Sequence, residues 1–183
     1  GSSGGGKTTL LRTLAGLESI DSGKLILDGE DITNKNPRDR NIGMIFQSYC
    51  LFPTMNVFDN VAYGLKIKKV EAKAIEKEVF SALESVNLQD KAKSYPSQMS
   101  GGEQQRVALA RSIVMKPKVL LLDEPFNAID AKLRKSLQMK VKDLHEEYNM
   151  TSIMVTHDQD EAMIMSDIIH LLKDGNIEQS GTS

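Results

Sequence analysis

The spacing of apolar residues divides the chain into helical stripes that alternate with short apolar runs. The stripes recur at intervals of three and four, the period of a helix buried on one face, over 7–17, 57–65, 70–86, 100–115, 131–148 and 158–165. Short runs typical of strands occupy 24–29, 41–47, 119–122, 151–156 and 168–172, with a last strand after 174–175. Because strands alternate with helices, the pattern predicts an α/β fold whose mainly parallel sheet is flanked by helices.

The stretch 48–115 differs from the rest because it has helical stripes and no strand pattern. We therefore expect an inserted helical subdomain over 48–115, ending with the helix that starts near Ser100, and a core formed by 1–47 and 116–183. In the first helix of the core, the pattern predicts a buried stripe made of Leu10, Leu11, Leu14 and Leu17.

Composition narrows the classes of function without selecting one. The formal net charge of −2 and the isoelectric point near 6.0 do not indicate the basic surface of a nucleic-acid-binding protein, so no nucleic-acid partner is expected. The one cysteine, Cys50, excludes an internal disulfide, and we expect it to be a small buried apolar residue. No apolar run approaches the roughly 20 residues that a membrane-spanning helix needs, so no such helix is expected in this sequence.

Residues 1–9 match the phosphate-binding pattern G-x-x-x-x-G-K-[ST] at every required position. Glycines let several backbone N–H groups point at one anion, and the following helix directs its positive end at the same anion. Lys7 is expected to contact the β- and γ-phosphates of a nucleotide, and Thr8 to ligate Mg²⁺. The residues expected to bind nucleotide here are Gly1, Ser2, Ser3, Gly4, Gly5, Gly6, Lys7, Thr8 and Thr9.

The Gly-Ser-Ser-Gly start is also compatible with an expression scar or a flexible linker. The run Lys7-Thr8-Thr9 opens an amphipathic helix, which argues against that alternative. The motif belongs between a strand and a helix, and no residues precede Gly1 in this sequence. We therefore expect that N-terminal strands are missing and that the 183 residues are an excerpt of a longer chain.

Two carboxylates, Asp123 and Glu124, directly follow the apolar strand 119–122. In a P-loop fold the carboxyl end of such a strand lies beside the phosphates. Asp123 is therefore expected to associate with Mg²⁺, and Glu124 to orient and deprotonate the attacking water. A strand that simply ends in a solvated turn is the alternative when this pair is taken alone.

Ser100 and Glu103 have the spacing of a capping box at the start of a helix. The glycines between them, Gly101 and Gly102, weaken a helix but give an anion close access to backbone N–H groups. A helix cap and an anion site are compatible here, and both interpretations stay open.

Together these motifs resemble those of ABC-type ATPases. The run 99–106, MSGGEQQR, is similar to the signature motif of that family. The other family motifs occur in the expected order: the phosphate loop, Gln47 before an aromatic loop, Asp123-Glu124-Pro125, the D-loop Asn127-Ala128-Ile129-Asp130, and Val155-Thr156-His157-Asp158. The resemblance covers the chain from end to end and implies an ATPase with a P-loop NTPase core.

The resemblance also implies roles for single residues. Gln47 would sense the metal and γ-phosphate, Glu124 would be the catalytic base, and His157 would contact the γ-phosphate. The implied catalytic set is Glu124, His157, Gln47 and Lys7, and the implied metal ligands are Thr8, Gln47 and Asp123. ATP and Mg²⁺ are the implied cofactors, with further nucleotide contacts from Ser100, Gly101, Gly102, Glu103 and Asp130.

Each implied role has a structural alternative: Gln47 as a polar strand end, His157 as a hydrogen-bonded structural histidine, and Asp130 as a helix N-cap. The chain also departs from the family pattern. Asn127 stands where the family usually has Ser, and Glu103 where it usually has Gln. The family's adenine-stacking aromatic residue lies upstream of the phosphate loop, outside these 183 residues.

Four stretches are similar to bacterial importers that are fed by a solute-binding protein, such as the polyamine, ferric-ion, sulfate and sugar uptake ATPases: 47–53, 57–61, 156–162 and 173–179. The resemblance implies ATP-driven solute import by a head-to-tail dimer of two copies, with transmembrane permease subunits docking near Gln47 and 49–58. It also implies a cytoplasmic location on the inner face of the membrane. An exporter cassette, or a non-transport ABC ATPase of DNA-repair or translation type, is the alternative, and the solute cannot be read from this chain.

Overall fold

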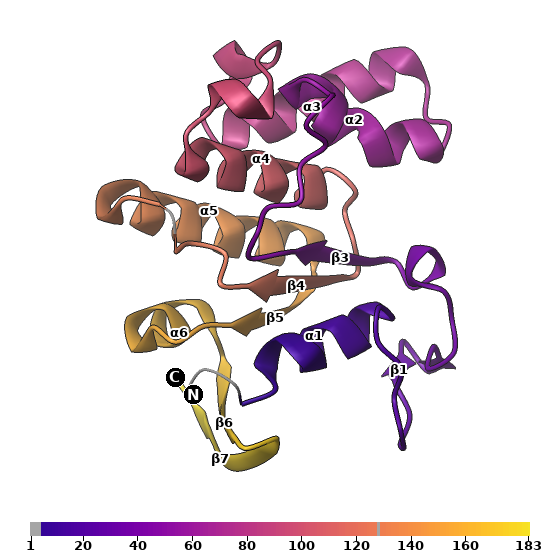
Figure 1. Ribbon diagram of the computed structural model, residues 1–183, viewed down its shortest axis with the longest axis vertical. Helices are drawn as coiled ribbons and strands as arrows, with labels where there is room; N and C mark the ends of the chain where they lie inside the picture. The colour runs from indigo at the N-terminus through magenta and orange to yellow at the C-terminus, as the bar shows by residue number, and fades with distance from the viewer. Residues whose placement is uncertain (1–4, 128) are drawn as a thin grey trace.

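A parallel sheet lies at the centre of the molecule (Figure 1). The computed structural model describes residues 5–127 and 129–183, with the backbone only for Lys132, Lys140 and Leu144. The strands of the sheet, in spatial order, are β3 (Ile42–Ile45), β4 (Val119–Asp123) and β5 (Thr151–Val155). Val119 is paired in register with both Ile42 and Thr151, so the strands end together at one edge. The predicted α/β fold with a parallel sheet is confirmed.

Helices cover both faces of this sheet (Figure 1). One face carries α1 (Lys7–Ala15), and the other carries α4 (Gly101–Ile113) and α5 (Ala131–Tyr148). An outer layer of α2 (Val57–Ile67) and α3 (Ala72–Ser85) packs on α4. The helices α2 to α4 occupy the stretch 48–115, but its separation from the core as a subdomain stays a prediction.

Shorter elements complete the fold. The helix α6 (Gln159–Met165) follows β5, and two antiparallel pairs consist of β1 (Ile26–Leu27) with β2 (Glu30–Asp31) and β6 (Ile168–Lys173) with β7 (Asn176–Thr182). Single 3₁₀ turns span Pro37–Asp39, Gln89–Lys91 and Pro96–Gln98. Within the residues that the structure describes, no helix combines the length and the apolar character that crossing a bilayer requires.

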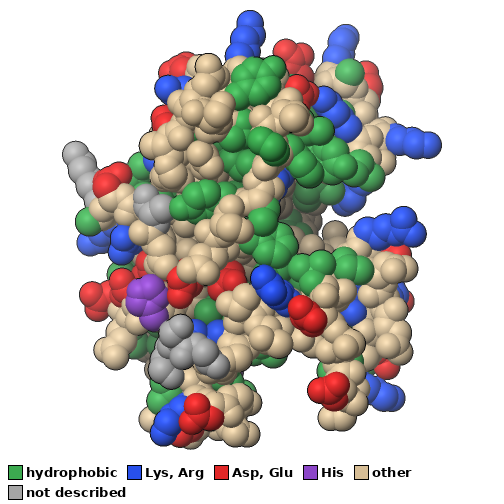
Figure 2. All heavy atoms as spheres, in the orientation of Figure 1, with side chains coloured by type: hydrophobic (Ala, Val, Ile, Leu, Met, Phe, Trp, Pro, Cys, Tyr) green, Lys and Arg blue, Asp and Glu red, His purple; other side chains and the backbone are tan. Residues whose placement is uncertain are grey.

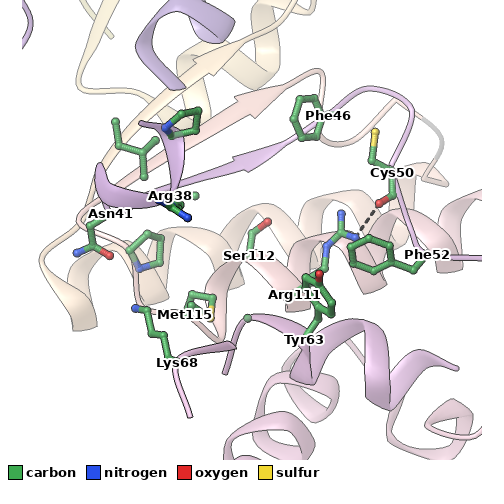
Figure 3. A pocket seen from close by; sticks show the side chains of 15 residues that line it. Arg38, Asn41, Phe46, Cys50, Phe52, Tyr63, Lys68, Arg111, Ser112 and Met115 are labelled. Atoms are coloured by element: carbon green, nitrogen blue, oxygen red, sulfur yellow. Dashed lines mark hydrogen bonds between the residues drawn. The ribbon is translucent and has the colours of Figure 1, made fainter. Parts of the chain in front are cut away.

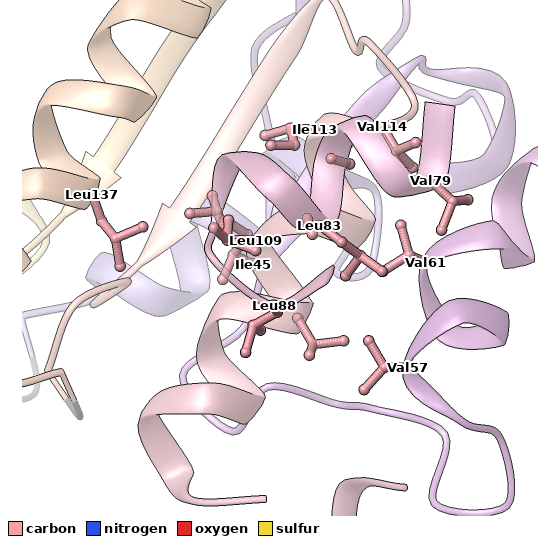
Figure 4. Packing of buried hydrophobic residues seen from close by; sticks show 14 of the residues in the cluster. Ile45, Val57, Val61, Val79, Leu83, Leu88, Leu109, Ile113, Val114 and Leu137 are labelled. Carbon is pink, nitrogen blue, oxygen red and sulfur yellow. The ribbon is translucent and has the colours of Figure 1, made fainter. Parts of the chain in front are cut away.

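The central strand β4 is buried along its whole length. Because successive side chains of a strand point to opposite faces, Leu120 and Leu122 enter the larger apolar core with the helices α2 to α5, whereas Val119 and Leu121 pack against α1. Figure 4 shows part of the larger core, with Val61, Leu83 and Leu109 from its helices. The unbroken Val-Leu-Leu-Leu run is thus a strand covered on both faces. This packing fixes the end of β4, from which the candidate site is built.

The predicted buried stripe of α1 is wrong in two positions. Leu11 is fully buried and Leu14 packs beside it, but Leu10 and Leu17 are 45% and 48% exposed. Leu10 lies on the exposed side of α1, and Leu17 lies beyond the end of the helix, after the left-handed C-cap Gly16. Ala15, which the stripe omitted, takes the remaining place against the sheet.

Candidate functional site

The candidate site begins where the phosphate loop enters α1. Gly6 is the N-cap of this helix and has a φ of 83°, a left-handed conformation that glycine adopts without steric cost. Lys7 and Thr8 form the first turn, while Thr9 is exposed and its carbonyl accepts the hydroxyl proton of Thr13. Gly5 is buried. The predicted contacts of Gly1, Ser2, Ser3 and Gly4 lie outside the described residues.

Thr8 and Asp123 meet at the end of β4. The Thr8 hydroxyl donates to Asp123 Oδ1 at 3.3 Å, and Asp123 is 4% exposed. Burial raises the pKa of Asp123 above its ordinary value, an effect opposed by the Thr8 hydrogen bond and by the charges of Arg12 and Lys7. A cation bound beside this carboxylate would favour its charged form. Of the three side chains that the sequence assigned to a metal, Thr8 and Asp123 therefore lie in direct contact.

Glu124, the next residue, is held by side chains from the ends of all three strands. Gln47, after β3, donates through Nε2 to Glu124 Oε2 at 3.0 Å, and His157, after β5, lies with Nδ1 3.1 Å from Oε1. Asn127 donates through Nδ2 to the same Oε2 at 2.5 Å. The sequence motifs at 47, 124 and 157 thus converge on one carboxylate, because the carboxyl ends of parallel strands share an edge.

The backbone of Glu124 contributes to this arrangement. Its φ is 49°, in the left-handed region that non-glycine residues rarely adopt. Its N–H donates to the carbonyl of Val155 on β5 at 2.9 Å, and its own carbonyl accepts from Gln105 of α4 at 3.4 Å. The side chain is 19% exposed and His157 is 62% exposed. The result is a partly shielded carboxylate, oriented for proton transfer at a solvent-facing edge.

Two partners of Glu124 were not predicted from the sequence. Asn127 was named only as a member of the D-loop and a departure from the family pattern, and Gln105 only as a member of the run 99–106; neither was assigned a contact with Glu124. The spacing of three residues between Glu124 and Asn127, in a segment that closes the turn before α5, is the signal from which the Asn127 contact could have been found. No local signal exists for Gln105, because its contact with Glu124 depends on how α4 packs over the sheet.

The residue before His157 is held in place by the buried carboxylate of Glu161. Glu161 of α6 is 2% exposed, and its Oε2 accepts the hydroxyl proton of Thr156 at 2.7 Å. Asp158 caps α6 by accepting from the N–H groups of Asp160 and Glu161. Both neighbours of His157 in the chain are therefore fixed by hydrogen bonds, which limits the positions that the imidazole can take.

The capping box predicted at the signature segment and the helix cap predicted at the D-loop are both present. Ser100 Oγ accepts from the N–H of Glu103 at 3.3 Å, and Glu103 Oε2 accepts from the N–H of Ser100 at 2.9 Å. This second bond lowers the pKa of Glu103. Asp130 accepts from the N–H of Leu133 and so caps α5. Across the described residues, no hydrogen bond or ion pair brings Ser100 or Glu103 to the carboxylate of Glu124.

A cavity of about 500 Å³ lies between the helical layer and the edge of the sheet (Figure 3). Apolar side chains gather over this layer (Figure 2), and those lining the cavity include Phe46, Phe52, Tyr63, Met115 and Pro117, with Arg38, Lys68 and Arg111 as basic residues. Cys50 also lines it and is exposed, which corrects the expectation of burial. The reason is local, since left-handed backbone at Tyr49 and Cys50 carries the thiol away from the sheet.

Comparison with known proteins identifies several similar chains. A family model described as ABC transporter matches residues 1–127. The sulfate/thiosulfate import ATP-binding protein CysA of Bacillus cereus is 52% identical over 186 residues, which cover 100% of this chain and 52% of that protein. The spermidine/putrescine import ATP-binding protein PotA of Haemophilus influenzae is 55% identical over 182 residues, covering 100% and 49%. The chain thus spans about half the length of the curated relatives it matches.

A solved structure shares the fold. It is a dimeric structure of a post-hydrolysis state of the ATP-binding cassette MJ0796 bound to ADP and Pi. That chain superposes with a TM-score of 0.91 and is 31% identical, with 99% of this chain and 82% of that chain covered.

Proposed function

Because this chain belongs to the ABC transporter family, we propose that it is the part of a transporter subunit that binds and hydrolyses ATP to energise solute import. The import ATP-binding proteins to which it is about 50% identical over its whole length support import over export. The observation that carries the proposal is the carboxylate of Glu124, held by donors from three strand ends beside the Thr8–Asp123 pair.

Nucleotide binding would use the segment that leads into α1. The left-handed Gly6 and the N-terminus of α1 are suited to a phosphate group, and Lys7 at the start of the helix adds a positive charge. The residues Gly1 to Gly4 would complete this loop. The similar cassette, whose structure was solved with bound ADP and Pi, supports a nucleotide as the ligand.

The residues at the end of β4 fit Mg²⁺. This ion prefers oxygen ligands and is usually bound through one or two protein oxygens with water and phosphate completing its shell. Thr8 and Asp123 supply hydroxyl and carboxylate oxygens within 3.3 Å of each other, and Gln47, whose Nε2 is engaged by Glu124, has its Oε1 for a ligand. When bound, Mg²⁺ would neutralise charge on the phosphate oxygens.

Glu124 would act as the general base. A carboxylate can take the proton of a water that attacks the γ-phosphate, provided that it lies within hydrogen-bond reach of that water. Asn127 orients the carboxylate from within the same turn, whereas Gln47 and His157 come from separate loops. His157, which is largely exposed, would turn from Glu124 toward the γ-phosphate.

A second copy would complete the nucleotide site. Ser100, Gly101 and Gly102 lie at the start of α4, and within the described part of one chain neither Ser100 nor Glu103 makes a hydrogen bond or ion pair with the carboxylate of Glu124. In a head-to-tail dimer, the N-terminus of α4 and its glycines would face the phosphates held by the other copy, and Asp130 would lie at the dimer contact. The dimeric state named for the similar cassette supports this arrangement.

The cavity between the helical layer and the sheet would receive a helix of a transmembrane permease. Its apolar lining offers contact area, and Phe52 and Cys50 belong to the segment just after Gln47, which joins the cavity to the nucleotide site. The subunit would then sit on the cytoplasmic face of the membrane, served indirectly by a solute-binding protein. Sulfate is an anion and spermidine a cation, yet relatives named for each are about equally similar, so the solute is selected by other subunits.

The substitution Glu124→Gln tests the proposal. The amide keeps an oxygen that accepts from Asn127 and Gln47 but cannot accept a proton from water, so ATP hydrolysis should fall by about 10²- to 10⁴-fold while ATP binding persists. Phosphate release and nucleotide affinity are measured on the full-length protein, with Glu76→Gln, an exposed change in α3, as the control. Phosphate release within twofold or so of the control would contradict the assignment of Glu124.

A further inference from the structure

Arg111 of α4 donates hydrogen bonds to the backbone of the segment that follows Gln47 (Figure 3). Its Nη1 donates to the carbonyl of Cys50 at 2.7 Å, and its Nη2 donates to the carbonyl of Tyr49 at 2.9 Å. The guanidinium carbon also lies 5.7 Å from the centre of the Phe52 ring. A planar guanidinium suits such paired contacts, which the single ammonium of a lysine cannot reproduce.

The segment that Arg111 holds has an unusual backbone. Tyr49 and Cys50 are both left-handed, with φ of 59° and 47°. Two adjacent non-glycine residues in this conformation persist only when their surroundings impose it. The carbonyls that accept from Arg111 belong to these same two residues, so the guanidinium is placed to impose the conformation. Partial burial of the guanidinium lowers the pKa of Arg111.

The same segment also reaches the other end of α4. A methyl group placed on Gly101 would lie 3.7 Å from the hydroxyl oxygen of Tyr49. Tyr49 therefore approaches α4 at two places, with its carbonyl at the Arg111 guanidinium and with its hydroxyl near Gly101 at the start of the helix. Cys50 and Phe52 meanwhile line the cavity. One short segment thus contacts both the cavity and the helix that begins with the signature motif.

We propose that Arg111 is a positioning residue that couples the cavity to the nucleotide site, by making residues 49–52 move together with α4. This inference rests on the proposed function, because it requires ATP to act at the N-terminus of α4. Any reorientation of α4 when ATP binds would then be transmitted to the cavity wall. Conversely, a partner bound in the cavity would change the position of α4 through the same contacts, since such coupling is reciprocal.

The native Cys50 thiol provides a direct readout. It is exposed, lies on the coupled segment, and is the one cysteine of these 183 residues. The full-length protein, with any cysteine outside this stretch replaced by alanine, is labelled with a maleimide with and without Mg-ATP. The Glu124→Gln background prevents turnover during labelling. ATP binding is measured separately with a fluorescent nucleotide.

Mg-ATP is expected to change the labelling rate of Cys50 by about fivefold or more, at the lower end of usual coupling factors. In Arg111→Lys and Arg111→Met this nucleotide effect should fall below about twofold, while ATP affinity and the melting temperature stay close to those of the parent. Lys68→Met, which removes a cation from the same cavity lining, is the matched control and should keep the effect.

The outcomes separate the two proposals. Absence of ATP binding in the parent protein would refute the proposed function itself. Normal ATP binding without a change in Cys50 labelling, or a change that persists in both Arg111 variants, would refute the coupling role alone. If Arg111→Met does not fold, Arg111→Lys and the parent measurement still decide between these results.

Discussion

Asn60 of α2 anchors the wall of the cavity, and its substitution is expected to be costly. The side chain is fully buried and bonds only to the backbone of residues 52–56. Its Oδ1 accepts from the N–H of Phe52 at 2.8 Å, and its Nδ2 faces the carbonyls of Phe52, Met55 and Asn56 at 3.0 to 3.1 Å. No other side chain supplies these contacts within the described residues.

Asn60→Ala removes the hydrogen-bond partners that the Phe52 N–H and the Met55 carbonyl have in a buried place, whereas the carbonyls of Phe52 and Asn56 keep a backbone N–H donor. A buried unpaired group costs about 1–3 kcal/mol, and since water enters part of the vacated space, the expected total is about 3 kcal/mol. For a domain of this size that corresponds to a fall in melting temperature of about 6–12 °C. Asn60→Asp should be at least as destabilising, because it turns a carboxylate oxygen toward three carbonyl oxygens.

Asn56→Ala is the matched control, because it removes the same side chain from the same helix. Asn56 caps α2 by accepting from the N–H of Asp59 at 2.7 Å, a contact worth about 1 kcal/mol. Urea and thermal unfolding of the three variants are compared with the parent protein. The reasoning is refuted if Asn60→Ala is no more destabilising than Asn56→Ala, or if Asn60→Asp is more stable than Asn60→Ala.

Two further substitutions test the surroundings of the site. Gly16→Ala should lower the free energy of unfolding by about 3 kcal/mol, because Gly16 has a φ of 80° and an added Cβ would lie 2.6 Å from the buried guanidinium of Arg40. A loss below about 1 kcal/mol in thermal unfolding would contradict this. The pKa of Glu103 is lowered chiefly by the hydrogen bond from the Ser100 N–H. The ionised Glu103 therefore stabilises the fold at pH values above its unfolded-state pKa, and this stabilisation is lost as the pH falls through its folded-state pKa. The stability difference between parent and Glu103→Gln should therefore shrink on acidification below pH ~4.5, and a constant difference would argue against the cap.

Local signals in the sequence were sufficient to predict the elements that carry the site. The helix expected over 131–148 has those bounds, because Asp130 caps its start and Asn149 ends it in a left-handed conformation. The strand at 119–123 was recognisable because it is apolar on both faces. The convergence of Gln47, Glu124 and His157 follows from parallel strand order, once each residue is placed at a strand end.

The contacts between distant segments could not be predicted in the same way. Arg111 is 62 residues from Tyr49 and 61 from Cys50 in sequence, and no spacing rule relates it to their carbonyls. The exposure of Cys50 likewise depends on two successive left-handed residues that have no glycine to announce them. Such features arise from the approach of α4 to the loop after β3, which only the assembled fold determines.

The backbone conformation of Glu124 has a consequence for evolution in the laboratory. A φ of 49° strains a residue with a Cβ by about 1 kcal/mol, and glycine would remove that strain. A screen that rewards thermal stability alone would therefore favour Glu124→Gly, at the position that we propose for the general base. Selection for robustness and selection for turnover pull in opposite directions here. Under the proposed function, stabilised variants recovered without an activity filter would be enriched in chains that bind ATP but do not hydrolyse it.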